Sequence, residues 1–336
     1  MSFARFAFLG TSSAVPRPGH RNVSGMLLQF SGGSSAIIDC GESTQQQMMR
    51  SNARLGSVDN ILITHLHGDH CYGLFGLIHT LNMNGRNTPL NVYGPKGVDE
   101  LLNTVFRLSG GWDGFPLNIT ELEPDRVHTF DLRAGGLGTK PIAHVHACPM
   151  VHRISAFGYV IREPEQPRIL DAGKAKHHGV EGPSLGRLKA GEDVELPDGS
   201  VVASRDVTTP GRPARTIAIL QDTCDASSAI PYIKRCDLLV HEATFESAFK
   251  DKAVEYGHST SVMAAQTAVE SEAKKLVLTH FSSRYSDDGG NSILGIEAEQ
   301  FLRENGSDAK VLLAEDFMSI SGDDFSIISS ILPPTN

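Results

Sequence analysis

Four side chains that can bind a metal ion lie within six residues of one another. His65, His67, Asp69 and His70 follow directly after the apolar run 61–63. The end of a strand places side chains beyond the edge of its sheet, and the alternation of an extended chain puts His65 and His67 on one side. Three imidazoles and a carboxylate are too many ligands for one open zinc site. They fit two adjacent divalent ions, each of which needs three or four nitrogen or oxygen ligands.

Further ligands for such a pair of ions stand at the ends of later apolar runs. His152, Asp222 and His280 each end such a run, and a carboxylate such as Asp222 can bridge two cations through its two oxygens. The chain has 14 histidines, and most of the others are interpreted as ordinary core or surface groups, among them His20, His79, His128, His144, His146, His177 and His178.

The elements that must position these side chains are those of an α/β protein. Short apolar runs rich in β-branched residues predict strands at Ala36–Cys40, Ile61–Thr64, Leu90–Tyr93, Phe157–Ile161, Thr216–Leu220, Leu238–His241, Lys275–His280 and Val311–Ala314. Between them, helical spacing with plausible start signals predicts helices after Thr44, over Val98–Arg107 and over Val262–Ala273. The strands form two families, one before about residue 165 and one after about residue 215.

Composition restricts the class of protein. The chain has 336 residues, of which 40% are hydrophobic and 21% charged, which is typical of a soluble globular protein. No apolar run approaches the roughly 20 residues that span a bilayer, and the first ten residues read directly as a strand, so no membrane association is expected and the cytoplasm is the expected compartment. The five cysteines include no C-x-x-C pair, which favours reduced thiols. The net charge of −9 argues against a general nucleic-acid coat protein but allows a local basic groove.

One segment departs from the α/β pattern. Residues 163–199 contain four prolines and several glycines, with one helical turn expected near Ala172–His178. Such a long segment without core signals is either a mobile surface loop or a functional insertion. The composition alone supports both readings equally.

The ligand pattern resembles the metallo-β-lactamase superfamily. The His-x-His-x-Asp-His motif with later His, Asp and His ligands is typical of that superfamily, whose αββα sandwich carries a dinuclear metal site at the sheet edge. The resemblance implies two Zn²⁺ ions per subunit, the first held by His65, His67, His152 and Asp222, and the second by Asp69, His70, Asp222 and His280.

Two further motifs resemble the ribonuclease Z (tRNase Z) family. His241-Glu242-Ala243-Thr244 closes an apolar run, and His258-Ser259-Thr260 stands where a helix would start. In that family a Glu and a His relay a proton to the leaving oxygen, which implies these roles for Glu242 and His258. Taken alone, Thr260 is an ordinary helix N-cap. Leu220-Gln221-Asp222-Thr223 departs from the family, which usually has Gly before Asp-Thr, and a local backbone change with the ligand kept is expected there.

The insertion resembles the Gly-Pro-containing arm with which short-form ribonuclease Z enzymes grip tRNA. The matching residues are Gly182 and Pro183, followed by Arg187 and Lys189, which could meet phosphates. The resemblance therefore implies a single metallo-β-lactamase-fold domain over residues 1–336, with a tRNA-binding arm at 163–199.

The implied reaction is the zinc-dependent removal of the 3′ trailer from precursor tRNA. It would leave a 3′-hydroxyl on the tRNA and a 5′-phosphate on the trailer. Asp69 would orient the attacking water while binding metal, and Arg284 would offset charge on the phosphoryl oxygens. The family also implies a homodimer in which the arm of one subunit holds the tRNA that its partner cleaves.

Two other functions compete with this one. A thioesterase or small-molecule phosphodiesterase on the same fold explains the metal motif but leaves the insertion and the relay motifs unexplained. An RNA-binding scaffold with an inactive site is disfavoured because every ligand position is filled.

Overall fold

The computed structural model describes residues 2–17, 19–135, 140–285 and 290–330. The chain forms two compact units: a main unit made of Met1–Arg162 and Thr216–Asn336, and a second unit made of Glu163–Arg215.

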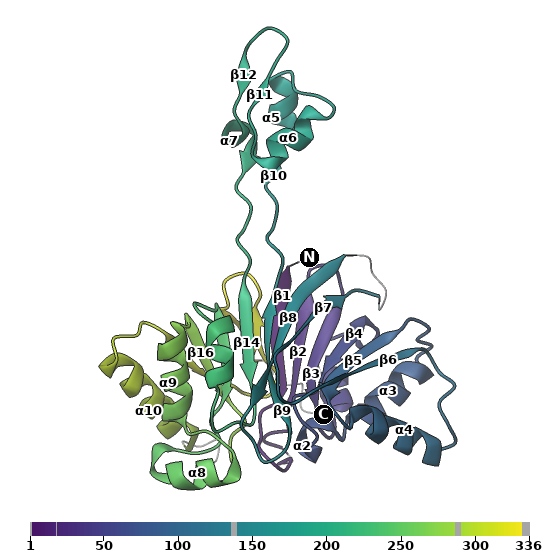
Figure 1. Ribbon diagram of the computed structural model, residues 1–336, viewed down its shortest axis with the longest axis vertical. Coiled ribbons are helices and arrows are strands. Elements are labelled where there is room, and N and C mark those ends of the chain that lie inside the picture. Colours follow the sequence, from purple (N-terminus) through teal and green to yellow (C-terminus); the bar gives the residue numbers. More distant parts are fainter. Residues whose placement is uncertain (1, 18, 136–139, 286–289, 331–336) are drawn as a thin grey trace. The chain divides into compact units, whose positions relative to one another are not determined.

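Two mixed sheets form the centre of the main unit (Figure 1). Among the described residues the first sheet has, in spatial order, β19 (Ile327–Ser330), β18 (Met318–Ser321), β1 (Phe3–Gly10), β2 (Gly25–Phe30), β3 (Ser35–Cys40), β4 (Val58–Leu62), β5 (Leu90–Pro95) and β6 (Leu117–Leu122). The second has β17 (Lys310–Leu313), β16 (Lys275–Thr279), β15 (Leu238–Glu242), β14 (Thr216–Leu220), β9 (Ala156–Arg162), β8 (Pro141–Met150) and β7 (His128–Arg133).

The inner faces of the two sheets enclose one apolar core. Phe6, Phe8 and Leu28 from the first sheet join Tyr159 and Val240 from the second in a single buried cluster. Because each strand of a sandwich turns alternate side chains toward the other sheet, the two sheets are held face to face by apolar contact.

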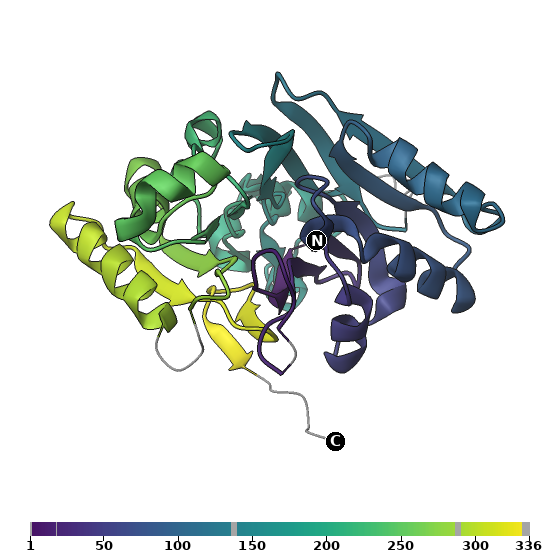
Figure 2. The same cartoon turned by 90° about the horizontal axis from the view of Figure 1, so that it is seen from below.

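Helices cover the outer face of each sheet, as Figure 2 shows from below. In α3 the apolar residues Leu74, Leu77, Ile78 and Leu81 recur at the spacing of one helical face, and this face is buried in the cluster outside the first sheet. That cluster packs the helices α1 (Thr44–Arg50), α2 (Gly68–Cys71), α3 (Leu74–Met83) and α4 (Val98–Leu108).

The outer face of the second sheet carries its own helices. The described ones are the 3₁₀ helix η2 (Ser227–Tyr232), α9 (Ser261–Ser271) and α10 (Gly290–Glu304), with α8 (Lys250–Tyr256) before α9. The layers are therefore helix, sheet, sheet, helix, which is the αββα sandwich that the sequence predicted. Within the described residues no helix is long and apolar enough to cross a bilayer.

The predicted strands all overlap observed ones, and the three predicted helices correspond to α1, α4 and α9. The two families of strands along the chain do not coincide with the two sheets. β7, β8 and β9 precede the insertion yet belong to the second sheet, while the C-terminal β18 joins the first sheet beside β1. Pairing between distant strands decides sheet membership, and no local pattern encodes that pairing.

The second unit has a small core of its own, so it is not a loop without structure. It contains the helices α5 (Ala172–His177), α6 (Ser184–Ala190) and α7 (Ser204–Val207) and the strands β10 (Ile169–Leu170), β11 (Val194–Glu195), β12 (Val201–Val202) and β13 (Thr208–Thr209). Ala175, Leu188, Val194 and Val207 are among the residues of its buried cluster. The unit extends to Arg215, beyond the residue 199 at which the sequence analysis ended it, because β12, α7 and β13 complete this core and its pairing.

Candidate metal centre

The predicted ligands lie in loops that leave the two sheets at the same edge. His65 and His67 follow β4, whereas Asp222 and His280 follow β14 and β16. β14, β15 and β16 are parallel, so their carboxyl ends meet at one edge. β8 is antiparallel to β9, which is antiparallel to β14, so the end of β8 brings His152 to the same edge.

The first group of ligand atoms surrounds one point. His67 Nδ1 lies 3.1 Å from His65 Nε2 and 3.2 Å from His152 Nε2. The Oδ2 atom of Asp222 lies 3.5 Å from His65 Nε2 and 3.8 Å from His152 Nε2. Tetrahedral zinc with bonds of about 2.0–2.1 Å separates its ligand atoms by about 3.3 Å, so these four residues fit one zinc ion.

A second group lies on the other oxygen of Asp222. The Nε2 atoms of His70 and His280 are 3.1 Å apart, and each is 3.2 Å from Asp222 Oδ1. Asp69 Oδ2 is 3.6 Å from His70 Nε2 and 3.5 Å from His280 Nε2. Asp222 therefore faces both groups, with one oxygen toward each.

The charges of this region fit bound cations. Asp222 Oδ1 is buried and accepts no hydrogen bond among the described residues, which is costly for a carboxylate unless a positive charge lies beside it. Burial lowers the pKa of His65 and His152, which favours the neutral imidazole that binds metal. Burial also lowers the pKa of His70, but the carboxylates around it, Asp222 foremost, raise it well above its ordinary value. A divalent cation would supply the positive charge that these carboxylates attract.

The outer nitrogens of the ligand histidines are held by acceptors. His70 Nδ1–H donates to Asp39 Oδ2 (2.7 Å), and His152 Nδ1–H donates to the carbonyl of Gly257 (2.7 Å). A carboxylate and a carbonyl can only accept, so both imidazoles present the lone pair of Nε2 to the metal position. His280 Nδ1 lies 3.0 Å from Thr244 Oγ1. This hydroxyl oxygen can accept the Nδ1–H of His280, because its own hydrogen is donated to Glu242.

Glu242 and His258 form a buried pair beside the ligands. His258 Nδ1–H donates to Glu242 Oε1 (3.0 Å), and Thr244 Oγ1–H donates to Glu242 Oε2 (2.6 Å). Burial lowers the pKa of His258, but the Glu242 carboxylate outweighs this and raises the pKa to about 9. His258 Nδ1 also lies 3.7 Å from Asp222, yet its engagement by Glu242 leaves that nitrogen unsuited to binding metal. The pair therefore places an imidazole, held by a buried carboxylate, in the wall of an open cavity.

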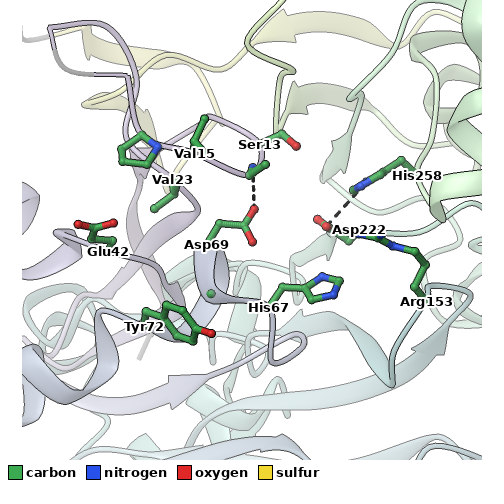
Figure 3. A pocket seen from close by; sticks show the side chains of 13 residues that line it. Ser13, Val15, Val23, Glu42, His67, Asp69, Tyr72, Arg153, Asp222 and His258 are labelled. Atoms are coloured by element: carbon green, nitrogen blue, oxygen red, sulfur yellow. Dashed lines mark hydrogen bonds and ion pairs between the residues drawn. The ribbon is translucent and has the colours of Figure 1, made fainter.

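An open cavity leads to the metal position, and Figure 3 shows its lining. The cavity has a volume of about 360 Å³ and is lined by His67, Asp69, Asp222 and His258 together with Arg153 and Tyr72. Asp69 Oδ2 also accepts a hydrogen bond of 2.7 Å from the backbone N–H of Ala14, so the first loop of the chain reaches the site.

The remaining predicted site residues, Arg284 and those of the second unit, are not among the residues that line this cavity. Arg284 is exposed, with its guanidinium over Phe249 (4.8 Å to the ring centre) and Phe245 (5.2 Å). In the second unit, Gly182 has a φ of 63° and Pro183 precedes α6 directly. Arg187 and Lys189 are exposed, and Arg187 forms a surface ion pair of 3.0 Å with Glu192.

The sequence analysis missed several residues that hold or line the site. Asp39 orients His70 from the end of β3, 31 positions earlier in the chain. Its one local signal is an acid at a strand end, and its φ of 58° became visible only in the structure. Arg153, which directly follows the predicted ligand His152, was not predicted to line the cavity. Thr244 was part of a predicted motif, but its contacts with Glu242 and His280 became visible only in the structure. Gln221 stands where a Gly was expected from the family resemblance. The adjacent Asp222 nevertheless lies between the two ligand groups, with one oxygen toward each.

Known proteins resemble this chain over almost its whole length. It is 41% identical to ribonuclease BN of Cronobacter sakazakii over 317 residues, which covers 94% of this chain and 98% of that protein. The chain belongs to the ribonuclease BN family.

Two solved structures and one family model also match this chain. The short form of human tRNase Z matches with a TM-score of 0.65 and 30% identity, covering 94% of this chain and 98% of that one. The metallo-β-lactamase fold protein YhfI of Bacillus subtilis matches with a TM-score of 0.62 at 18% identity, covering 94% and 98%, which supports the fold alone. A family model described as anti-Pycsar protein Apyc1 matches residues 4–123. The resemblance to the ribonuclease Z family and the metallo-β-lactamase fold are both confirmed.

Proposed function

We propose that this protein is a metal-dependent endoribonuclease that removes 3′ trailers from precursor tRNA, leaving a tRNA 3′-hydroxyl and a 5′-phosphate on the trailer. The observation that carries the proposal is the convergence of two ligand groups on the two oxygens of Asp222, beside the Glu242–His258 pair. It occurs in a chain that is 41% identical to a ribonuclease BN over almost its full length.

The ligand set supports two zinc ions per subunit. His65, His67 and His152 with Asp222 would hold one, and the second would be held by Asp69, His70, His280 and the other oxygen of Asp222. Bound zinc supplies a hydroxide nucleophile at neutral pH and neutralises developing negative charge on a phosphoryl group.

Side chains of the protein orient the water, donate the proton and bind the RNA. Asp69, fixed by the N–H of Ala14, orients the attacking water. His258, held by Glu242, donates a proton to the departing 3′-oxygen. Arg153 lines the cavity and faces the phosphate there. Arg284, stacked on two phenylalanine rings, is better placed to bind the RNA beside the cavity than to touch the reacting phosphate.

The second unit is the proposed tRNA-binding arm. Its helices carry exposed cations at Lys174, Lys176, Arg187 and Lys189, which suit contacts to phosphates. Its own buried core, with Ala175 of α5 and Leu188 of α6, joins the two helices that carry these groups in one cluster.

We also infer a homodimer in the cytoplasm. The family resemblance supports a dimer in which each arm serves the partner's site, and the five free thiols suit a reducing compartment. If arms act across the dimer, mixing a variant that lacks the arm with a metal-site variant restores cleavage that neither has alone. Sedimentation velocity would measure the state of assembly.

The decisive experiment is cleavage of an end-labelled precursor tRNA by the purified protein, with and without a chelator. We expect a single cut at the tRNA 3′ end that disappears with the chelator and returns when Zn²⁺ is added. Hydrolysis of small phosphodiesters or thioesters without cleavage of precursor tRNA would favour the competing hydrolase function instead.

A further inference from the structure

An exposed tyrosine stands at the mouth of the metal centre, and the proposed chemistry does not use it. Tyr72 follows α2 directly and lines the same cavity as His67 and Asp69. Its exposed fraction is 64%, which is high for a large aromatic side chain beside a buried site. Tyrosine is enriched at binding interfaces because its ring is apolar and its hydroxyl can remain in water.

The backbone on both sides of this ring is fixed. The N–H of Tyr72 donates to the carbonyl of Gly68 (3.0 Å), and the N–H of Gly73 donates to the carbonyl of Cys40 (2.9 Å). The ring lies against Gly68, because a Cβ atom added there would approach its carbons to 2.4–2.9 Å. That side of the ring is therefore packed on Gly68 in the segment 64–70 (the metal-binding loop), and the exposed surface of the ring lies away from it.

The charges around the cavity differ between its two sides. Figure 3 shows Tyr72 and Glu42 on one side of Asp69, with Arg153 and His258 on the other. A phosphate fits beside the arginine, whereas the side with the tyrosine and a carboxylate suits an uncharged, flat group. A nucleobase has that chemistry, and bases stack on aromatic rings in a sequence-tolerant way.

The position of the proposed proton donor, His258, determines on which side of the cavity the tRNA end and the trailer lie. His258 serves the departing 3′-oxygen, which belongs to the last tRNA nucleotide, so the tRNA end lies on the His258 side. We propose that Tyr72 is the stacking platform for the first nucleobase of the 3′ trailer and so positions the trailer side of the scissile phosphate. This inference rests on the endoribonuclease function proposed above. It explains how trailers of different sequence can be held equally well.

The test combines protein variants with modified precursors. For the wild-type protein, removing the base at the first trailer position should lower kcat/KM by roughly 5- to 150-fold, the range expected from loss of one base–aromatic stack. Tyr72→Ala should lower kcat/KM on the intact precursor by a similar factor. Tyr72→Ala on the abasic precursor should show no further loss, because both changes remove the same contact.

Two further variants separate stacking from other roles. Tyr72→Phe should keep wild-type kcat/KM, because the ring rather than the hydroxyl makes the contact. Tyr232→Ala removes another exposed tyrosine, 40% exposed and not part of the cavity lining, and should have no effect. Additive losses, a Phe variant as slow as the Ala variant, or coupling to the last tRNA base instead of the trailer base would each overturn the proposal.

A binding measurement keeps this inference separate from the cleavage reaction. With 2-aminopurine as the first trailer base, wild-type protein should quench its fluorescence on mixing, before any cleavage, and Tyr72→Ala should not. If wild-type protein quenches the probe but does not cut, the endoribonuclease function fails and the stacking contact stands. If it cuts without quenching the probe, the stacking contact fails alone.

Discussion

Asp39 is a buried carboxylate that belongs to neither ligand group but holds a member of one, His70. It accepts hydrogen bonds from His70 Nδ1 (2.7 Å) and from the N–H and hydroxyl of Thr64 (2.8 and 2.9 Å). It thereby fixes the imidazole of His70 and the first residue of the metal-binding loop together. Partners of this kind set the tautomer and basicity of a metal ligand.

We expect Asp39→Asn to weaken zinc binding by roughly 10- to 100-fold, as is typical when such a partner loses its charge. Asparagine tolerates the positive φ of this position, so the backbone should keep its shape. Zinc titration with a competing chromophoric chelator measures the effect. Asp59→Asn, at another buried aspartate that contacts Ser34 and Arg86, is the control and should leave zinc affinity unchanged. Equal affinity in all three proteins would contradict the role of Asp39.

His258 is predicted to act on the leaving group without binding metal. His258→Ala should slow the cleavage step by roughly 10²- to 10⁴-fold, the usual contribution of a general acid, while zinc content stays at the wild-type level. Single-turnover kinetics and metal analysis of the same preparation give both numbers. A variant that loses zinc along with activity would identify His258 as a ligand instead.

At the scale of elements, close contacts between backbones place the metal-binding loop. A Cβ atom at Gly41, just after β3, would lie 2.2 Å from the carbonyl oxygen of Asp69, and one at Gly73 would lie 2.0 Å from that of Gly41. The end of β3, helix α2 and the start of α3 can approach this closely only because both positions lack a side chain. The ligands Asp69 and His70 depend on that approach.

Gly73→Ala should therefore lower the free energy of unfolding by about 1–3 kcal/mol, the usual cost of overpacking, and should also weaken zinc binding. Gly56→Ala is the matched control, because a Cβ atom there meets nothing within 4 Å. Chemical denaturation followed by circular dichroism compares the two variants. Wild-type stability and zinc affinity in Gly73→Ala would show that the close approach is unimportant.

At the scale of the whole molecule, the metal centre joins the two halves of the sandwich. His65 and His67 follow β4 of the first sheet, and Asp69 and His70 lie in the next element, α2, whereas His152, Asp222 and His280 follow strands of the second sheet. Each of the two ligand groups, with Asp222 counted in both, takes residues from both halves of the sandwich. Bound metal thus adds a link between the sheets to the apolar core that already holds them.

The proposed arm can be removed without cutting into either sheet. Arg162 at the end of β9 and Thr216 at the start of β14 are partners in an antiparallel register, so an Asn-Gly turn can replace Glu163–Arg215 and close a two-residue hairpin. We expect this variant to keep its zinc content, its thermal stability and its hydrolysis of bis(p-nitrophenyl) phosphate. Its kcat/KM for precursor tRNA should fall by roughly 10²-fold or more, because phosphate contacts supply much of nucleic-acid affinity.

The small-substrate assay is the internal control for that variant. A loss of both activities would indicate a disturbed fold, which circular dichroism would detect. Undiminished cleavage of precursor tRNA by a folded variant would rule out the second unit as the tRNA-binding arm.

The sequence by itself determined the ligand-bearing segments and most of the elements that carry them. Apolar runs with β-branched residues marked β4, β14, β15 and β16, and the chemistry of His and Asp at their ends indicated metal. These are local properties, since strand periodicity and the placement of polar groups at strand ends act over a few residues. The motifs at Glu242 and His258 are each contiguous in the chain, and their roles were implied by the resemblance to the ribonuclease Z family.

Only the tertiary structure decided which residues surround those groups. Asp39 meets the site from β3 and Arg153 from the loop between β8 and β9, and the membership of β7 to β9 in the second sheet follows from long-range pairing. The small core of the second unit also escaped detection, because its few apolar residues are scattered between prolines and glycines. Contacts between residues far apart in the chain depend on how whole layers pack, and a linear pattern does not record that packing.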